Sequence, residues 1–300
     1  MNVGPTIIQD TFAEAFSMRC ARLIVTAADD HWLAAALAEA TGYASSVIAC
    51  DVEAAVERRL AAGQTPDGRG GAAILFFGFS AEALGKALAA RTGQCLMTCP
   101  TTAVFDGLRE AAERVALGRH LRFFGDGYQK SKLLGERRYW RIPVMDGEFL
   151  VEETAGIEKG IAGGNLILQG REQTATLAAA RRAVESIAAA PGVITPFPGG
   201  VVRSGSKVGS RYKALKASTA HAYCPTLRGR TQTLLHPDAN CCYEIVINGT
   251  SREAIADAMR RAMHAAAGDD LVAITAGNYG GKLGKHHFHL HALLSAGATA

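Results

Sequence analysis

A short internal repeat constrains the fold of this chain more than any other feature of its sequence. The pattern Gly-x-Ser-x-Glu-Ala-aliphatic follows a hydrophobic run twice, beginning at Gly78 and again at Gly249. Three hundred residues with a hydrophobic content of 48% can bury a large core, and this length suits two domains or one duplicated domain. The repeat favours the duplication.

The first half of the chain shows the element order of a β-α-β-β-α-β unit. Strands are predicted at residues 22–27, 45–50, 72–77 and 94–98. Asp29 or Asp30 would cap the first helix, and Gly42 would close it. Ser80 would cap the second helix, and Gly93 would end it. This order is that of the ferredoxin-like split unit.

The second half repeats the same order. Strands are predicted at residues 165–169, near 201, at 243–248 and at 271–275. The first helix would start at Thr174 and end at Pro191-Gly192, and a capping box of Thr250 and Glu253 would open the second. The fold class is therefore α+β, with two ferredoxin-like lobes that arose by duplication.

Residues 105–158 lie between the two units and mix short strands with turn signals, such as Gly125-Asp126-Gly127 and Met145-Asp146-Gly147. We interpret them as a β-rich insertion on the first lobe. The expected domains are thus residues 1–160, which include the insertion, and residues 161–300.

The two copies of the repeat differ at one position. Aligning them places Ala73 opposite Glu244, so one strand holds an ionisable group where the other is apolar. Burying a carboxylate beside Ile245 and Val246 costs several kcal/mol unless it is paired, hydrogen-bonded or shifted in pKa. Glu244 is therefore a candidate catalytic carboxyl. A strand-end glutamate that faces solvent or joins a structural ion pair is the alternative, and both remain open.

Composition excludes several function classes. The net charge is +4 without a long basic block, which does not indicate nucleic-acid binding. No apolar run approaches the ~20 residues of a membrane span, and residues 1–10 lack the pattern of a signal peptide. Seven cysteines without framework spacing fit reduced thiols. We expect a soluble cytoplasmic protein.

Four loops could bind a ligand, and three of them are rich in glycine. They are residues 123–129, 196–210, 218–226 and 276–284. Glycine lets the backbone approach a ligand closely, and successive N–H groups can form anion-binding nests. Positive charge accompanies the second loop, at Lys207, Arg211, Lys213 and Lys216. The loops suit an elongated polyanion, although tight turns with a solvated basic face are the alternative. None matches a Walker or dinucleotide motif.

Histidine and cysteine give weaker signals. The segment His286-His287-x-His289-x-His291 would place three rings on one face of a strand, but metal ligation needs convergent geometry that alternation does not supply. We favour packing or substrate contact and expect no metal. Cys224 and the Cys241-Cys242 pair are expected to be small buried groups rather than nucleophiles.

Taken together, these segments resemble formylmethanofuran:tetrahydromethanopterin formyltransferases. The residues that carry the resemblance are 10–16, 123–129, 162–165, 196–200, 206–209, 222–226, 243–249, 276–284 and 289–291. They follow one another in order over almost the whole chain. Members of this family have a pair of ferredoxin-like lobes in each subunit, which agrees with the repeat.

The resemblance implies reversible transfer of a formyl group between the amine of methanofuran and N5 of tetrahydromethanopterin. Both coenzymes are then substrates in a ternary complex, and no metal or prosthetic group takes part. The glutamate of the family's Tyr-Glu-Ile-Val-Ile-Asn-Gly strand lies at the reacting centre, and it falls on Glu244. A carboxyl with a raised pKa could protonate the leaving amine. Lys207 or loop amides could stabilise the oxyanion.

The four loops would bind the two substrates. The predicted binding residues are Asp126, Gly127, Tyr128, Gln129, Gly199, Gly200, Ser206, Tyr223, Asn278, Gly280 and Gly281. The basic segment 207–216 suits the carboxylates of a methanofuran-type carrier and the acidic tail of the pterin.

An alanine-rich chain with a pI of about 8.7 differs from acidic archaeal members of the family, which favours a C1-oxidising bacterial relative working towards formate. The resemblance implies a homotetramer, and in such bacteria a bound formylmethanofuran hydrolase. Residues 227–240 fit a partner interface or a variable loop. A non-catalytic, carrier-binding subunit of a hydrolase complex and a ferredoxin-like sensor of small molecules remain as alternative functions.

Overall fold

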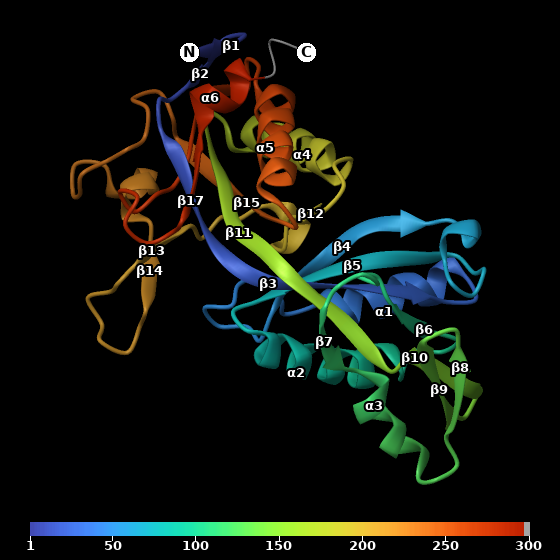
Figure 1. Ribbon diagram of the computed structural model, residues 1–300. Helices are drawn as coiled ribbons and strands as arrows, with labels where there is room; N and C mark the ends of the chain where they lie inside the picture. Colours follow the sequence, from blue (N-terminus) through green and yellow to red (C-terminus); the bar gives the residue numbers. More distant parts are fainter. Residues whose placement is uncertain (297–300) are drawn as a thin grey trace. The chain divides into compact units, whose positions relative to one another are not determined.

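The computed structural model describes residues 1–296, which form two compact units (Figure 1). Unit 2 is the contiguous segment Met18–Gly160, and unit 1 combines Met1–Ser17 with the chain from Ile161 onward. No helix within these described residues is both long and apolar enough to cross a membrane.

The N-terminal residues belong to unit 1 because their strands pair there. Strand β2 (Thr6–Ile8) runs parallel to β16 (Leu271–Thr275), and the first residues of β3 (Phe12–Thr26) pair with β17 (His286–His289). The expected domain of residues 1–160 therefore differs from unit 2 at its N-terminal end. The rest of the two-domain division stays a prediction.

Unit 2 is built on a β-α-β-β-α-β unit. Its elements in chain order are β3, α1 (Asp30–Thr41), β4 (Glu53–Leu60), β5 (Gly71–Gly78), α2 (Ala81–Arg91) and β6 (Ala103–Asp106). The strands form an antiparallel sheet in the order β4-β5-β3-β6, which is the ferredoxin-like arrangement. Both helices pack on one face, where Leu33 and Leu84 share a core with Ile74.

Side-chain caps begin the two helices of unit 2 at the predicted residues. Asp29 caps α1 and Ser80 caps α2, each by accepting a backbone N–H group at 3.1 Å. Such a cap stabilises a helix by about 1 kcal/mol. Gly42 directly follows α1, as predicted. Gly93 does not end its helix, because the π-helical turn Thr92–Leu96 continues α2.

Two strand predictions in unit 2 are wrong. Residues 45–50 form turns, and the second strand is β4. Charged residues interrupt the apolar alternation of β4, so its sequence does not look like that of a strand. The strand tolerates the buried Glu57 because Glu57 forms an ion pair with Arg22 at 2.6 Å. Residues 94–98 fall on the π-helical turn and the turn after it, and the fourth strand is β6. A short apolar run fits a helix and a strand about equally well.

The predicted β-rich insertion extends the sheet of unit 2. Its elements are β7 (Glu113–Ala116), α3 (Gly118–Leu121), β8 (Lys130–Leu134), β9 (Arg137–Val144) and β10 (Gly147–Glu152). Strands β8, β9 and β10 form an antiparallel meander, and β10 runs parallel to β6. The buried Asp106 fastens the insertion, because its carboxylate accepts the Gly156 N–H at 3.0 Å and an Arg114 N–H at 2.6 Å.

Unit 1 repeats the topology of unit 2. Its elements are β11 (Thr154–Gly170), which enters the unit at Ile161, then α4 (Gln173–Ala188), β12 (Val193–Ile194), β15 (Cys241–Gly249), α5 (Arg252–Ala266) and β16. The antiparallel order is β12-β15-β11-β16, again with the first strand between the third and the fourth. The short strand β1 (Asn2–Val3), β2, β17 and α6 (Leu290–Ser295) complete the unit. The duplicated ferredoxin-like fold predicted from the repeat is present.

Two details in unit 1 differ from the predictions. The second strand is β12 rather than a strand at 201, although Val202 forms a one-residue bridge with Glu244. Ser251, and not Thr250, caps α5 by accepting the Ala254 N–H at 3.1 Å. Ser251 is the serine of the repeat and corresponds to Ser80, which caps α2, so the repeat predicts this cap correctly and the capping-box pattern does not.

The two faces of the unit 1 sheet have different coverings. Helices α4 and α5 lie side by side on one face, where Ile245 and Ile247 are fully buried (Figure 1). Side chains alternate along a strand, so Glu244 and Val246 point to the opposite face. That face adjoins the loops that join the strands, including the hairpin of β13 (Ser206–Val208) and β14 (Ala217–Thr219).

Candidate functional site

Glu244 lies in the middle of the unit 1 sheet, on the face opposite the helices. It pairs with Ile167 of β11, and Ile167 also pairs with Thr275 of β16. These three residues form one row across the sheet and point to the same side. Glu244 therefore stands among side chains from three neighbouring strands.

The carboxyl group of Glu244 has no hydrogen-bond or ion-pair partner within residues 1–296. Only its main chain is engaged, because Val202 exchanges two hydrogen bonds with it at 2.7 and 2.9 Å. Burial without a compensating charge raises the pKa of Glu244 to about 7. The group can therefore give or take a proton near neutral pH, which a solvated or ion-paired glutamate does not do.

Two tyrosines stand near this carboxyl group. Burial raises the pKa of Tyr223, and the charges of Cys242 and Glu244 add to the rise. A hydrogen bond with the Thr275 side chain lowers this pKa, but it does not cancel the rise. Burial also raises the pKa of Tyr279, with Glu244 and then Glu14 contributing. Both phenols therefore remain protonated and can donate hydrogen bonds. Tyr223 is a predicted site residue, whereas Tyr279 is not among the predicted ones.

Gly205 adjoins the carboxyl group from the base of the β13–β14 hairpin. A Cβ atom at this position would lie 3.2 Å from Oε2 of Glu244, so glycine keeps the space beside that oxygen open. The Gly205 carbonyl accepts the Ala220 N–H at 2.8 Å, which closes the base of the hairpin. The hairpin therefore starts beside the candidate catalytic group.

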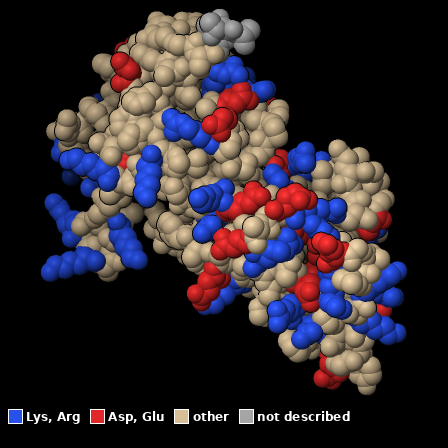
Figure 2. All heavy atoms as spheres, in the orientation of Figure 1, with Lys and Arg blue, Asp and Glu red and all other residues tan. Residues whose placement is uncertain are grey.

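Lys207, the second predicted catalytic residue, lies in β13 opposite Ser218. No interaction among the described residues joins it to Glu244, so its catalytic role stays a prediction. Basic side chains gather on the hairpin and its approaches, at Arg203, Lys207, Arg211, Lys213 and Lys216. The sequence from 186 to 237 contains no acidic residue, and Figure 2 shows blue side chains without red ones on this hairpin.

The last glycine-rich loop, residues 276–284, surrounds an anion that belongs to the chain itself. Glu14 in β3 is only 1% exposed, and its carboxylate accepts four backbone N–H groups of the loop. The donors are Tyr279 at 2.7 Å, Gly281 at 2.9 Å, Leu283 at 2.6 Å and Gly284 at 2.5 Å. Burial alone would raise the pKa of Glu14, but these hydrogen bonds outweigh it and lower that pKa.

The predicted ligand nest in this loop is therefore occupied. Asn278, Gly280 and Gly281, which are the predicted binding residues of this loop, have contacts within the chain. The Asn278 side chain donates to the Phe12 carbonyl at 3.1 Å and accepts the Gly280 N–H at 3.1 Å. Gly280 and Gly281 have φ values of 71° and 73°, which favour glycine. Any contact of these three residues with substrate stays a prediction.

Packing accounts for one of the two glycines predicted near residue 200. A Cβ on Gly200 would lie 2.7 Å from Val184 and 2.8 Å from Thr195, so α4 requires glycine there. Gly199 is exposed, and a Cβ there would meet nothing within 4 Å. Ser206 is exposed at the start of β13. Gly199 and Ser206 are thus open to a ligand.

The predicted binding residues Asp126, Gly127, Tyr128 and Gln129 belong to unit 2, whereas Glu244 belongs to unit 1. Asp126 and Gly127 have φ values of 50° and 90°, and the Gln129 side chain accepts the Gly127 N–H at 2.9 Å. Tyr128 is 78% exposed. The segment is a tight turn that presents an aromatic ring to solvent, and its role in binding stays a prediction.

The histidines near the C-terminus have local partners. His287 and His291 donate to main-chain carbonyl oxygens at 3.1 and 2.7 Å, and the His289 ring lies 5.1 Å from that of Phe12. In the described part of the chain, no group of three or more His, Cys, Asp or Glu residues forms a metal site.

The cysteines are free thiols. Burial raises the pKa of Cys242 to about 12, and the charges of Cys224, Cys241 and Glu244 act in the same direction. A thiol with such a pKa stays protonated at neutral pH and is a poor nucleophile. Cys242 therefore fits the predicted role of a small packing group.

Residues 227–240 are held against their own sheet. Arg228 donates to the main-chain oxygens of His236 and Pro237 at 3.0 and 2.9 Å. Leu235 shares a small core with Val272, and Tyr223 packs against that core. The segment therefore supports the tyrosine next to Glu244, which neither predicted alternative for it had included.

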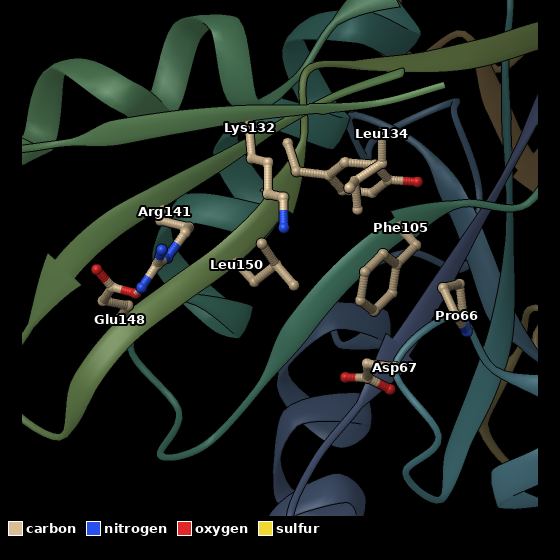
Figure 3. A pocket seen from close by; sticks show the side chains of 9 residues that line it. Pro66, Asp67, Phe105, Lys132, Leu134, Arg141, Glu148 and Leu150 are labelled. Atoms are coloured by element: carbon tan, nitrogen blue, oxygen red, sulfur yellow. Dashed lines mark hydrogen bonds and ion pairs between the residues drawn. The ribbon is translucent and has the colours of Figure 1, made fainter. Parts of the chain in front are cut away.

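A cavity of about 380 Å³ lies within unit 2 (Figure 3). Its lining consists of Pro66, Asp67, Phe105, Lys132, Leu134, Tyr139, Arg141, Glu148 and Leu150. Phe105 pairs with Ile24, and Ile24 pairs with Ala73, so this face of the sheet corresponds to the Glu244 face of unit 1. The cavity contains no predicted site residue.

Comparison with known proteins covers nearly the whole chain. Residues 1–144 match the sequence model of the formylmethanofuran-tetrahydromethanopterin formyltransferase family, and residues 147–293 match that of its proximal lobe. Two bacterial relatives of that name are similar along the chain. The relative from Methylobacillus flagellatus is 51% identical and that from Methylococcus capsulatus 52%, each with 98% of this chain and 100% of the relative covered.

Solved structures agree with these sequence matches. The formyltransferase from Methanosarcina barkeri is 46% identical, with a TM-score of 0.93 over 98% of this chain and 100% of its own. A chain of the formyltransferase/hydrolase complex from Methylorubrum extorquens, solved with methylofuran, is 49% identical, with a TM-score of 0.92 over 96% of each chain. The resemblance stated from the sequence and the α+β fold class are confirmed. The chain belongs to the formylmethanofuran–tetrahydromethanopterin formyltransferase family.

Proposed function

We propose that this protein transfers a formyl group between formylmethanofuran, or a methanofuran analogue, and N5 of tetrahydromethanopterin, with Glu244 as the group that moves the proton. The observation that carries this proposal is the unpartnered carboxyl group with a pKa of about 7. An ordinary glutamate would be ionised at that pH and could not act as an acid. Membership of the formyltransferase family supplies the reaction.

The reaction needs a proton at a defined point. N5 attacks the formyl carbon, a C–N bond forms, and a tetrahedral intermediate results. The bond to the methanofuran nitrogen then breaks, and that nitrogen must gain a proton to leave as an amine. The Glu244 carboxyl gives this proton and afterwards takes the one released by N5, so the group is restored. Such transfer typically contributes about 10²–10⁴-fold to the rate.

The intermediate also carries a negative oxygen. Tyr223, which is a protonated donor near Glu244, is our candidate to stabilise it, together with Lys207 in the neighbouring hairpin. The N–H groups of residues 276–284 that bind Glu14 are unavailable for this task. A donor aimed at the oxyanion typically contributes about 10²–10³-fold.

The basic hairpin suits the acidic parts of both coenzymes. It begins at Gly205 beside the carboxyl group, and the segment around it lacks acidic residues. Gly199 and Ser206 are exposed near its base and would contact substrate, and Asp126–Gln129 are kept as binding candidates on unit 2. Holding two large substrates together lowers the entropic part of the barrier.

The setting of the reaction also follows from the relatives. We infer a cytoplasmic protein that forms homo-oligomers and associates with formylmethanofuran hydrolase subunits, as the name of the Methylorubrum extorquens complex indicates for that protein. In a C1-oxidising bacterium the transfer would run towards formate.

A direct assay tests the proposal. Purified protein would be mixed with formylmethanofuran and tetrahydromethanopterin, and formyl-pterin would be followed by absorbance. Glu244→Gln should slow the transfer by at least about ten-fold while the carrier still binds. Glu172→Gln, which changes an exposed glutamate at the start of α4, is the matched control and should leave the rate unchanged. Carrier binding without turnover by the wild type would favour a non-catalytic subunit of a hydrolase complex.

A further inference from the structure

Glu14 joins the two ends of unit 1. It comes from β3 near the N-terminus, whereas its four N–H donors belong to residues 276–284 near the C-terminus. Both carboxylate oxygens are used, with Leu283 and Gly284 on Oε1 and Tyr279 and Gly281 on Oε2. Charge-assisted hydrogen bonds of 2.5–2.9 Å are strong ones, so this contact holds the loop tightly.

Two further side chains hold the same loop. His287 pairs with Glu14 across the strands and donates to the Gly284 carbonyl at 3.1 Å. At the start of the loop, Asn165 accepts the Gly277 N–H at 2.6 Å and donates to the Gly277 carbonyl at 3.1 Å. The loop is therefore fixed at its beginning by Asn165 and along its length by Glu14.

The anchored loop stands over the Glu244 face of the sheet. Asn165 pairs with Val246, two residues beyond the pairing of Ile167 with Glu244, so its side chain shares that face. Because Asn165 holds the first turn of the loop, the loop leaves β16 on the side of the carboxyl group. Tyr279 is the aromatic residue of this loop, and the loop brings its side chain to the Glu244 face of the sheet.

We propose that Glu14 is a positioning residue for the formyl transfer: it fixes the loop so that the Tyr279 phenol and the loop backbone cover the Glu244 carboxyl group. This inference rests on the proposed function of Glu244. Only a glutamate satisfies the geometry. Aspartate is one methylene shorter, and glutamine would turn an NH₂ group towards two N–H donors.

Glu14→Gln tests this role with three readouts, and Glu172→Gln serves as the exposed control. The first is the split between kcat and KM. A misplaced loop should lower kcat by about ten-fold and change KM much less, because positioning acts on the transition state. The second is hydrogen exchange of the amides of residues 279–284, which should quicken by about ten-fold or more in the variant.

The third readout is the pH profile of kcat/KM, which a merely structural role would not move. The titratable groups that face Glu244 are Tyr223, Tyr279 and Cys242, and burial keeps all three protonated near neutral pH. The decline of the rate above about pH 7 therefore reports Glu244. Water admitted by a loosened loop should move that decline to lower pH by about one unit.

Each outcome has a definite meaning. A folded Glu14→Gln protein with the kcat and pH profile of the wild type would overturn the positioning role. If Glu14→Gln does not fold, Gly280→Ala replaces it. It strains only the loop backbone, because φ is 71° and a Cβ there meets nothing within 4 Å. Wild-type protein without turnover would refute the proposed function instead, and the exchange measurement would still report whether Glu14 holds the loop.

Discussion

Glu244 and Ala73 occupy equivalent positions in the two β-α-β-β-α-β units. Each lies in the third strand of its unit and pairs with the central strand, Glu244 with Ile167 and Ala73 with Ile24. Each points to the face that the helices leave uncovered. Ala73 is 1% exposed and lies between Ile24 of β3 and Arg58 of β4, so the fold itself asks for no carboxyl group there. The repeated fold therefore gives no structural reason for the carboxyl group of Glu244, which is what the proposed function explains.

The equivalence predicts the effect of Ala73→Glu. The new carboxyl would be buried beside Ile24 and opposite Arg58 of β4, an exposed side chain that compensates the charge only in part, so the free energy of unfolding should fall by about 1–3 kcal/mol at pH 7. Urea denaturation would measure it. Ala73→Met introduces a side chain of similar length without charge and should cost less. Equal losses for the two variants would show that size alone decides.

The raised pKa of Glu244 predicts how stability depends on pH. A carboxyl with a pKa of about 7 in the folded protein favours the protonated state, so its contribution is fully present below the unfolded value of about 4.5. It is lost as pH rises through 7. Glu244→Gln should therefore match the wild type at pH 4.5 and be more stable at pH 8 and above. Thermal unfolding at both pH values would check it, and a constant difference would argue against the buried carboxyl.

The basic hairpin predicts a salt-dependent substrate affinity. Replacing Lys213 and Lys216 together by glutamate should raise KM for the more acidic coenzyme by about ten-fold at low salt, because exposed charges attract it. The effect should shrink towards 0.5 M salt, where the Debye length is only about 4 Å. Lys159→Glu makes a charge reversal at an exposed residue of unit 2 and serves as the control. An effect that persists at high salt would point to direct contacts instead.

Gly199 and Gly200 should respond differently to alanine. Gly200→Ala brings a methyl group within 2.8 Å of Val184 and Thr195 at a φ of 76°, so it should destabilise by about 2 kcal/mol or more. Gly199→Ala meets no atom, and its φ of 62° should cost about 1 kcal/mol. Melting temperatures would separate the two. A larger loss for Gly199→Ala would mean that packing against α4 is not what requires Gly200.

The sequence predicted the topology because burial leaves a regular trace. Residues 72–77 form an apolar run of strand length, residues 245–247 are apolar within a segment of the same length, and the repeat around Gly78 and Gly249 tied both segments to the same place in two units. The strand predictions were wrong where the local sequence lacks a regular apolar pattern or where a helix continues into a short apolar run. In β4 the buried Glu57 is compensated by Arg22, which a single strand's pattern does not reveal. Residues 94–96 are helical because the π-helical turn Thr92–Leu96 continues α2.

The candidate site was predictable in part. Glu244 could be identified because the other copy of the repeat has Ala73 at the equivalent position. Tyr223 could be identified because it lies in residues 222–226, which carry part of the family resemblance. Glu14 was missed because its partners are main-chain N–H groups some 270 residues away, which no local pattern records. The same contacts occupy N–H groups of residues 276–284, whose contact with substrate stays a prediction. A nest for an anion was correctly inferred, but the anion is the Glu14 side chain.

The contact between Glu14 and Gly284 also bears on the order of folding. Unit 2 is one contiguous segment, so its β-α-β-β-α-β core can form without the rest of the chain, whereas unit 1 needs both chain ends to meet. Closing so long a loop costs more entropy than any local contact and slows the step that requires it. The environment of Glu244 is therefore completed only in the final stage of folding, when the N-terminal strand has docked. During refolding, catalytic competence should return later than the bulk of the helical structure.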